Sequence, residues 1–178
     1  RPPRQTAKVL FRQATLFPAG PWNEPLYWLN ISIPEKVNHI KMRESVVLED
    51  DGYVYLNGAN SWAALHLPKF QFRPAHNDVF HFDLWHNGKN IIFDAGTYSY
   101  YRDDEENMID LKSVHYHNTV SFEGKEQMPE ISRFLLGSWI KADQISAIKQ
   151  ENGSSSWEGQ YTTNSGYIHK RSIKTAKN

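Results

Sequence analysis

Short runs rich in Val, Ile, Tyr, Phe and Trp recur along this chain, and turn dipeptides that end in glycine separate them. The clearest turns are Asp51-Gly52, Asn57-Gly58 and Asn87-Gly88, pairs that readily adopt the positive φ angles of tight hairpins. No long stretch repeats apolar residues at the spacing of an amphipathic helix. This pattern predicts an all-β protein, specifically an antiparallel β-sandwich.

The strongest predicted hairpin pairs residues 80–85 with residues 90–93 around Asn87-Gly88. In the first of these strands the even-numbered positions carry Phe, Phe and Leu, whereas the odd-numbered ones carry His, Asp and Trp. This alternation predicts a sheet with one face in the core and the other open to water or sugar. Further strands are predicted at 53–56, 119–122, 134–140, 145–148, 157–161 and 167–174, and the serine run 154–156 is predicted as a loop.

Length and the distribution of proline predict the domain organisation. The chain has 178 residues, enough for one core, and six of its nine prolines fall within residues 1–44. We expect residues 1–44 to be a lead-in that packs against a sandwich formed by residues 45–178. Because the chain starts at Arg1 and its last predicted strand has no successor, we expect it to be a piece of a longer protein.

Composition argues against several classes of function. Twenty Lys and Arg balance twenty Asp and Glu, so the chain lacks the overall positive charge on which many nucleic-acid-binding proteins rely. It contains no run of 18 apolar residues, so we expect no membrane-spanning helix. The absence of cysteine excludes disulfides, thiol catalysis and cysteine-ligated metal centres.

Histidine is concentrated in the middle of the chain, where six of the eight lie between positions 66 and 117. Three polar residues stand at the ends of predicted strands, namely His76, Asp94 and His117. Two imidazoles and one carboxylate suit zinc or another divalent cation with an open coordination position. Their spacing matches no local metal motif, so a second interpretation stays open. In it the histidines are hydrogen-bonded at strand ends and Asp94 caps a turn.

Two weaker patterns suggest a different metal site and a possible contact with sugar. His115 and His117 followed by Glu123 resemble the metal motif of cupins, although the Glu comes too late in the chain for that pattern. Trp85 either stacks on a sugar ring or packs under a neighbouring loop.

Four motifs follow one another in a specific order: 72–78 (FRPAHND), 82–85 (FDLW), 93–98 (FDAGTY) and 117–120 (HNTV). Two shorter ones, 127–128 (QM) and 132–135 (SRFL), continue the series. Together they resemble the heparinase II/III-like proteins, most closely members from bacterial surface-polysaccharide gene clusters. The combination is far more specific than any single motif.

This resemblance implies a β-sandwich that follows an N-terminal α/α toroid in a larger protein. It implies a polysaccharide lyase that cleaves uronic-acid-containing chains, such as heparin, heparan or alginate-like polymers, by β-elimination. It also implies that His76, Asp94 and His117 are ligands of a zinc-like ion, and that the protein works in the periplasm or cell envelope. Without the toroid, the chain alone is expected to be inactive.

One position departs from the lyase pattern. Degrading members of the family commonly carry His-x-His-x-Asp with a catalytic first His, and Pro74 occupies that place here. Because proline has no proton to exchange, the catalytic residue is unknown, with His81, His115 and Arg73 as candidates.

Further residues are assigned supporting roles. Asp78 is expected to orient His76, and Trp85, Tyr98 and Asn118 are expected to bind substrate. The alternative function is a non-catalytic, metal-stabilised domain that binds glycan during surface-polysaccharide metabolism.

Overall fold

The structure of this chain is a computed structural model, and it describes residues 2–35, 44–97, 110–132 and 134–176. The chain divides into two compact units, residues 1–43 and residues 44–178. Within the described ranges, no helix is long and apolar enough to cross a membrane.

The first unit contains helices that the apolar pattern did not predict. α1 spans Pro2–Arg12, the 3-10 turn η1 spans Pro21–Asn23, and α2 spans Glu24–Trp28. Prolines in the first turns of η1 and α2 fix the φ angle that a helix start requires. Since η1 has three residues and α2 has five, both are too short to show a helical repeat.

A buried glutamine ties this unit together. Gln5 is fully buried, and its Nε2 donates to Asn23 Oδ1 at 2.9 Å. Its Oε1 accepts from Leu16 N at 2.8 Å. These bonds join α1 to the segments that follow it. The packing of residues 1–44 against the sandwich stays a prediction.

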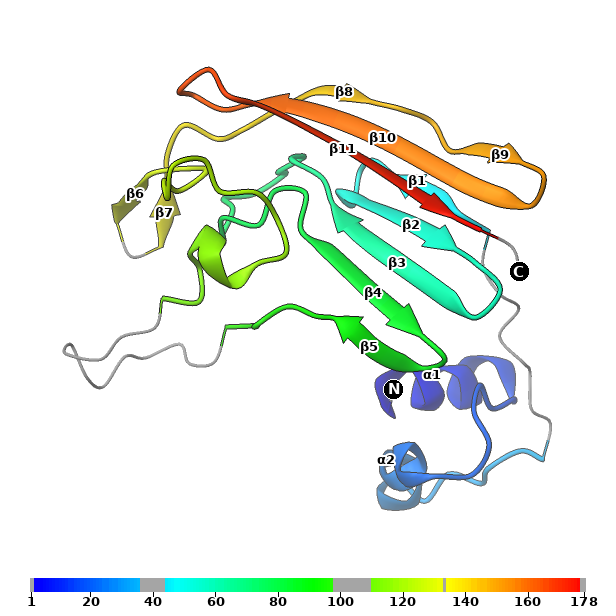
Figure 1. Cartoon of the computed structure of the whole chain (residues 1–178). Helices are drawn as coiled ribbons and strands as arrows, with labels where there is room; N and C mark the ends of the chain where they lie inside the picture. Colours follow the sequence, from blue (N-terminus) through cyan, green and yellow to red (C-terminus); the bar gives the residue numbers. More distant parts are fainter. Residues whose placement is uncertain (1, 36–43, 98–109, 133, 177–178) are drawn as a thin grey trace. The chain divides into compact units, whose positions relative to one another are not determined.

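The second unit is an antiparallel β-sandwich, as predicted (Figure 1). Its first sheet has five strands in the order β1-β2-β3-β4-β5. β4 and β5 form the predicted hairpin, and Asn87 (φ 48°) and Gly88 (φ 75°) take the left-handed conformation at its turn. The strands span Val46–Leu48, Tyr53–Asn57, Ser61–His66, Phe82–His86 and Lys89–Ile92.

The second sheet is built around one long strand, β10. β11 pairs with one edge of β10, while β8 and β9 pair with different parts of β10. A separate two-stranded ladder joins β6 and β7. These strands span Glu130–Ser132 (β6), Leu135–Leu136 (β7), Ala142–Ile145 (β8), Lys149–Glu151 (β9), Ser154–Thr162 (β10) and Ile168–Thr175 (β11).

The core fills the space between the inner faces of the two sheets. Phe80 is fully buried there and meets the rings of Trp157 and Tyr161 edge-on, at centroid distances of 5.6 and 5.1 Å. Gly159 is required because a Cβ at this position would lie 2.4 Å from Trp157 Cη2. Phe80 itself has a φ of 59°, an uncommon conformation for a bulky residue. The aromatic contacts and the loop around it therefore hold a strained backbone in place.

Most predicted strands are confirmed, and four details are wrong. The strand predicted at 145–148 falls between two strands, since β8 ends at Ile145 and β9 begins at Lys149. Residues 119–122 form no strand, only an isolated bridge between Phe122 and Lys125, because Thr119 N donates to His117 O and the chain turns back at Glu123-Gly124. Within the strand predicted at 134–140, only β7 forms, because the chain turns at Ser138 (φ 48°). The serine run 154–156 begins β10, since strand partners exist on both sides of it.

Candidate functional site

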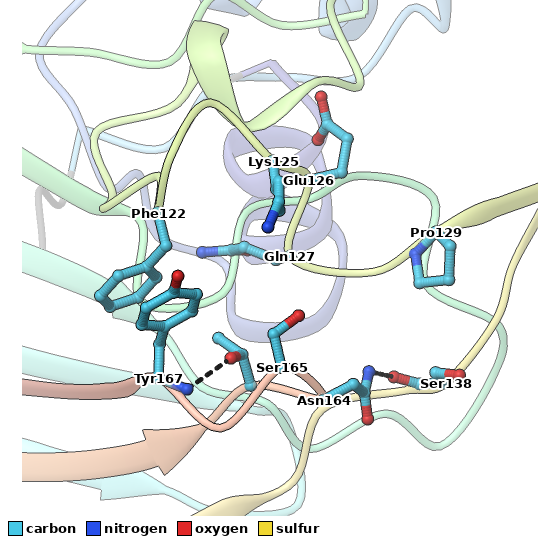
Figure 2. Close-up of a pocket in the computed structure, with 10 residues that line it drawn as sticks. Phe122, Lys125, Glu126, Gln127, Pro129, Ser138, Asn164, Ser165 and Tyr167 are labelled. Atoms are coloured by element: carbon cyan, nitrogen blue, oxygen red, sulfur yellow. Dashed lines mark hydrogen bonds between the residues drawn. The ribbon is translucent and has the colours of Figure 1, made fainter.

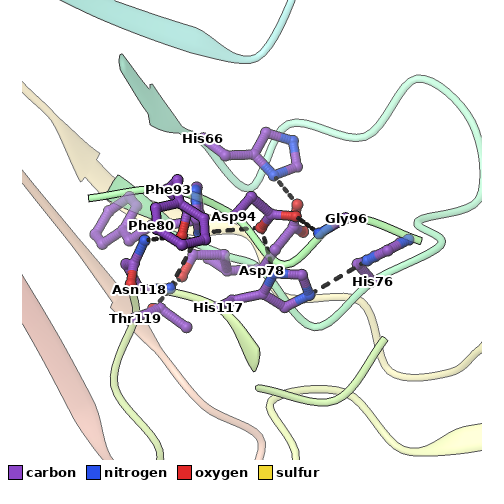
Figure 3. A network of polar contacts seen from close by, with 12 residues as sticks. His66, His76, Asp78, Phe80, Phe93, Asp94, Gly96, His117, Asn118 and Thr119 are labelled. Atoms are coloured by element: carbon purple, nitrogen blue, oxygen red, sulfur yellow. Dashed lines mark hydrogen bonds and ion pairs between the residues drawn. The ribbon is translucent and has the colours of Figure 1, made fainter. Parts of the chain in front are cut away.

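Asp94 and His117 meet beside the first sheet. Asp94 follows β5, and His117 caps the 3-10 turn η2 (Val114–Tyr116). His117 Nδ1 lies 2.6 Å from Asp94 Oδ2, and Gly96 N donates to Asp94 Oδ1 at 2.6 Å (Figure 3). The His117 side chain is fully buried, whereas that of Asp94 is 34% exposed. A carboxylate on Nδ1 favours the proton there and leaves the lone pair of His117 on Nε2.

The Asp94 carboxylate is held in its ionised form. Burial by itself would raise its pKa, but the Gly96 N–H and the His117 ring outweigh that effect and bring the pKa below its ordinary value. The negative charge therefore persists at neutral pH and is available to a cation.

His81 is the third residue of a cluster that can hold a metal ion. Ligand atoms of His81, Asp94 and His117 all lie within 4.8 Å of one another. His81 Nδ1, however, also accepts a hydrogen bond from Asn118 N at 3.0 Å. This bond occupies the Nδ1 lone pair and places the ring proton on Nε2. Burial lowers the pKa of His81, which keeps the ring neutral.

His76 approaches His117 from the other side of its ring. His76 Nδ1 lies 3.2 Å from His117 Nε2, while Asp94 contacts Nδ1 of the same imidazole. Two nitrogens bound to one tetrahedral zinc ion at its usual bond length lie about 3.3 Å apart. Burial lowers the pKa of His76, so its ring is neutral and can act as a ligand. The His76–His117 pair therefore fits a zinc-like ion.

The three residues that the resemblance implied thus lie in one line of contacts. The 2.6 Å separation of Asp94 Oδ2 and His117 Nδ1 is that of a hydrogen bond, and the implied role of Asp94 as a metal ligand stays a prediction. Asp94 stands behind His117, in the arrangement by which a carboxylate orients a metal-binding imidazole.

His66 has a carboxylate partner that the sequence did not reveal. His66 ends β3, and its Nδ1 lies 3.0 Å from Asp78 Oδ2. Asp78 was expected to orient His76, but the loop before β4 brings it to His66 instead, because Phe80 N bonds to His66 O at 2.8 Å. Tyr53 stacks on the His66 ring at 5.1 Å. The position of His66 at the end of a strand was the only signal in the sequence that could have singled it out.

Arg171 anchors the cluster from the second sheet. It lies on β11, and its Nη1 donates to Phe80 O at 2.5 Å and to Asn118 O at 2.8 Å. These carbonyls immediately precede His81 and follow His117 in the chain. Burial lowers the pKa of the Arg171 guanidinium. A single half-buried cation thus fixes both loops that carry the imidazoles.

Aromatic rings form a row on the outer face of the first sheet. Trp62 and Trp85 face each other in register, and their rings stack at 5.5 Å with an interplanar angle of 10°. Tyr55 lies against Trp62 at 6.4 Å, and Tyr53 stacks on Tyr55 at 6.0 Å. Because Tyr53 also stacks on His66, this row leads from Trp85 to the His66–Asp78 pair.

The remaining candidate catalytic residues lie outside this cluster of described residues. His115 is exposed on η2, and its backbone N–H bonds to Ser113 Oγ. Arg73 is exposed and lies over the Phe72 ring. Pro74, at the expected catalytic position, is buried.

The residues predicted to bind substrate, and the glutamate of the cupin-like pattern, have different outcomes. Asn118 Nδ2 donates to Phe93 O at 2.9 Å, so this side chain ties the end of β5 to the His117 loop. Tyr98 lies outside the described residues. Glu123 forms an ion pair with Lys125 at 2.9 Å and takes no part in the His81–Asp94–His117 cluster, contrary to the cupin pattern.

These observations define an antiparallel β-sandwich domain with a candidate metal centre. A family model described as "Heparinase II/III-like, C-terminal" matches residues 42–178. The match covers more than half of the chain, and the chain belongs to this family. No curated protein matches the chain. The family assignment confirms the resemblance seen in the sequence and relates the domain to polysaccharide lyases.

Proposed function

We propose that this chain is the β-sandwich domain of a lyase that cleaves uronic-acid-containing polysaccharides by β-elimination. The observation that carries the proposal is the His76–His117–Asp94 line of contacts, in a domain of the Heparinase II/III-like family. The domain would act together with an α/α toroid of the same protein, in a bacterial periplasm or cell envelope, as the resemblance implies.

The cation of this site would be zinc, held by His76 and His117. Asp94 contributes negative charge and orients His117 through the 2.6 Å contact. When bound, the cation supplies positive charge that neutralises the uronate carboxylate as the neighbouring carbon loses its proton. Burial of His76 supports this role, because a ligand imidazole must be neutral.

β-Elimination also requires a base for the C5 proton and an acid for the leaving O4. His66 is our candidate for the base. The Asp78 carboxylate beside its Nδ1 favours the proton on that nitrogen and leaves the lone pair on Nε2, which can then accept a proton. His81 is less suited, since Asn118 N–H occupies its Nδ1 lone pair. The acid would come from the toroid.

The aromatic row supplies a surface for sugar rings. Trp62 and Tyr53 are each 38% exposed, and Trp85 is half-buried beside Trp62. Pyranose rings present C–H groups on one face that pack on such aromatic surfaces. We propose that the polysaccharide lies along this row, with Trp85 as one contact and the bond to be cleaved near His66.

The proline at position 74 favours a second, non-catalytic function. Pro74 cannot exchange a proton, and family members that degrade polysaccharides commonly have histidine in that frame. The alternative is a domain that binds glycan and uses its metal only for stability.

The test uses the full-length protein that carries this domain. Heparan sulfate, alginate and polygalacturonate are incubated with it, and the unsaturated uronate product is followed by ultraviolet absorbance. We expect product from at least one polymer, and loss of product in the His66→Ala and His117→Ala variants. The exposed His115→Ala is the matched control and should keep activity. Glycan binding without product from any polymer would instead establish the non-catalytic alternative.

A further inference from the structure

A second concave site lies away from the histidine cluster. A pocket of about 320 Å³ opens between the loop after Thr119 and the turn that joins β10 to β11. It shares no lining residue with the His76, His81, Asp94 and His117 group. Residues from both segments line it, including Phe122, Lys125, Gln127, Asn164, Ser165 and Tyr167 (Figure 2). Ser138, from the chain between β7 and β8, completes the lining.

Two parallel rings form one wall of the pocket. Phe122 and Tyr167 stack with a centroid distance of 4.9 Å and an interplanar angle of 4°. Both side chains are half-buried, so part of this flat apolar surface stays accessible. A planar aromatic wall in a pocket of this size suits a ligand with a flat apolar face.

The base of the pocket is rigid. Gln127 is buried, and its Oε1 accepts from Val79 N at 2.9 Å while its Nε2 contacts Tyr161 Oη at 3.0 Å. The same Nε2 lies within hydrogen-bond distance of Val79 O and Thr119 Oγ1. With every polar atom of Gln127 engaged, the pocket keeps its shape without a ligand.

Several polar groups on the rim retain unused hydrogen-bonding capacity. Asn164 Nδ2 donates to Ser138 O at 2.7 Å, which leaves the Asn164 carbonyl oxygen as an acceptor. Ser138 and Ser165 carry hydroxyls for which the described part of the chain shows no hydrogen bond. Hydroxyl and amide groups around an aromatic wall are complementary to the hydroxyls around a sugar ring.

The lysine at the pocket is already paired, and a second carboxylate lies nearby. Lys125 Nζ pairs with Glu123 Oε2 at 2.9 Å. The Glu126 carboxylate accepts from Ser113 Oγ at 2.5 Å and from Val114 N at 2.9 Å. An anionic ligand would meet a lysine that is already paired and a nearby glutamate. The electrostatics therefore favour an uncharged ligand.

We propose that this pocket binds one uncharged pyranose ring of a glycan, stacked on the Phe122–Tyr167 pair. It is a binding site separate from the candidate metal centre, and it stands whether or not the domain takes part in β-elimination. For a polymer with both acidic and neutral sugars, it would select chains by a neutral unit.

The test measures binding of three probes to the whole chain: chitotetraose, cellotetraose and tetragalacturonate. Amide NMR signals report the site, and calorimetry reports the affinity. We expect at least one neutral probe to shift the signals of Ser165 and Gly166, and to bind more tightly there than tetragalacturonate. Tyr167→Ala should weaken this binding about tenfold because the stacking surface is lost. Tyr167→Phe keeps the ring and should bind like the wild type.

Three results would overturn the proposal. The first is no shift with either neutral probe, and the second is a stronger response to tetragalacturonate. The third is unchanged binding in Tyr167→Ala. The His117→Ala variant separates this site from the proposed lyase function. It should abolish product formation by the full-length protein and leave binding at the pocket of this chain intact.

Discussion

Asp94 Oδ2 lies 2.6 Å from His117 Nδ1, across 23 positions of the chain. The contact decides which nitrogen of the buried imidazole carries the proton. It therefore turns His117 Nε2 toward His76, and the pair forms a site with two nitrogen donors. Each residue alone is an ordinary polar group at the end of a structural element, and together they define the candidate metal centre.

The first prediction concerns metal content. The purified chain, without a histidine tag, is equilibrated with zinc, desalted and measured by elemental analysis. We expect about one ion per chain. His76→Ala and His117→Ala should remove it, and Asp94→Asn should weaken binding about 10- to 100-fold because His117 loses its orienting carboxylate.

Two further variants are the controls for this measurement. His115→Ala changes an exposed imidazole and should keep the ion. His81→Ala should also keep it, since Asn118 N–H already occupies His81 Nδ1. Loss of the ion in His81→Ala but not in His76→Ala would contradict our ligand pair and establish the His81–Asp94–His117 set.

The second prediction concerns Arg171. Replacing it with Met removes the donor to Phe80 O and Asn118 O and leaves two inward carbonyls without this partner. We expect the free energy of unfolding to fall by about 2–3 kcal/mol, measured by urea denaturation. Arg171→Lys keeps the charge but offers a single donor point, so it should lose less. Equal stability of the Met variant and the wild type would refute this role.

The third prediction concerns stability in acid. His169 is 5% exposed, its Nδ1 lies 3.0 Å from Tyr161 Oη, and burial lowers its pKa from 6.5 to about 4. Below pH 6.5 the unfolded chain takes up a proton that the folded chain does not. The contribution of His169 is therefore complete above that pH and declines as pH falls toward about 4. We expect a loss of up to about 3 kcal/mol in the free energy of unfolding.

The control for this effect is His169→Gln, which keeps a polar partner for Tyr161 and has no titratable group. Burial also lowers the pKa values of His76 and His81, so both add to the acid sensitivity of the wild type. The difference between wild type and variant isolates His169. If the two pH profiles of stability run parallel between pH 6.5 and about 4, His169 is not the group responsible.

The fourth prediction concerns the aromatic row. Trp85→Ala removes the ring that stacks on Trp62 and should weaken binding of the polymer substrate about tenfold, as measured by affinity electrophoresis. Ile91→Ala is the matched control, because Ile91 is a 54% exposed apolar residue on the neighbouring β5. Equal weakening in both variants would show a general effect on the sheet and not stacking at Trp85.

The strands and turns followed from local pattern. Gly88 and Asn87 predicted the turn of the β4–β5 hairpin, because only a few residue types adopt the left-handed conformation there. Alternation predicted which face of β4 is apolar, and Phe82 and Leu84 do pack against the core. The strand predicted at residues 119–122 is wrong because local backbone hydrogen bonds, from Thr119 N to His117 O and from Lys125 N to Phe122 O, take the place of strand pairing.

The sequence by itself determined the fold class, the family and the residue types of the candidate centre, because turn chemistry, strand alternation and ordered motifs are local properties. Tertiary structure alone decided the partners. It brought Asp78 to His66, gave the His81 lone pair to Asn118, and drew Arg171 from the second sheet to the Phe80 carbonyl. These contacts depend on how the loops pack in three dimensions. The spacing of residues along the chain does not give the distances between their side chains.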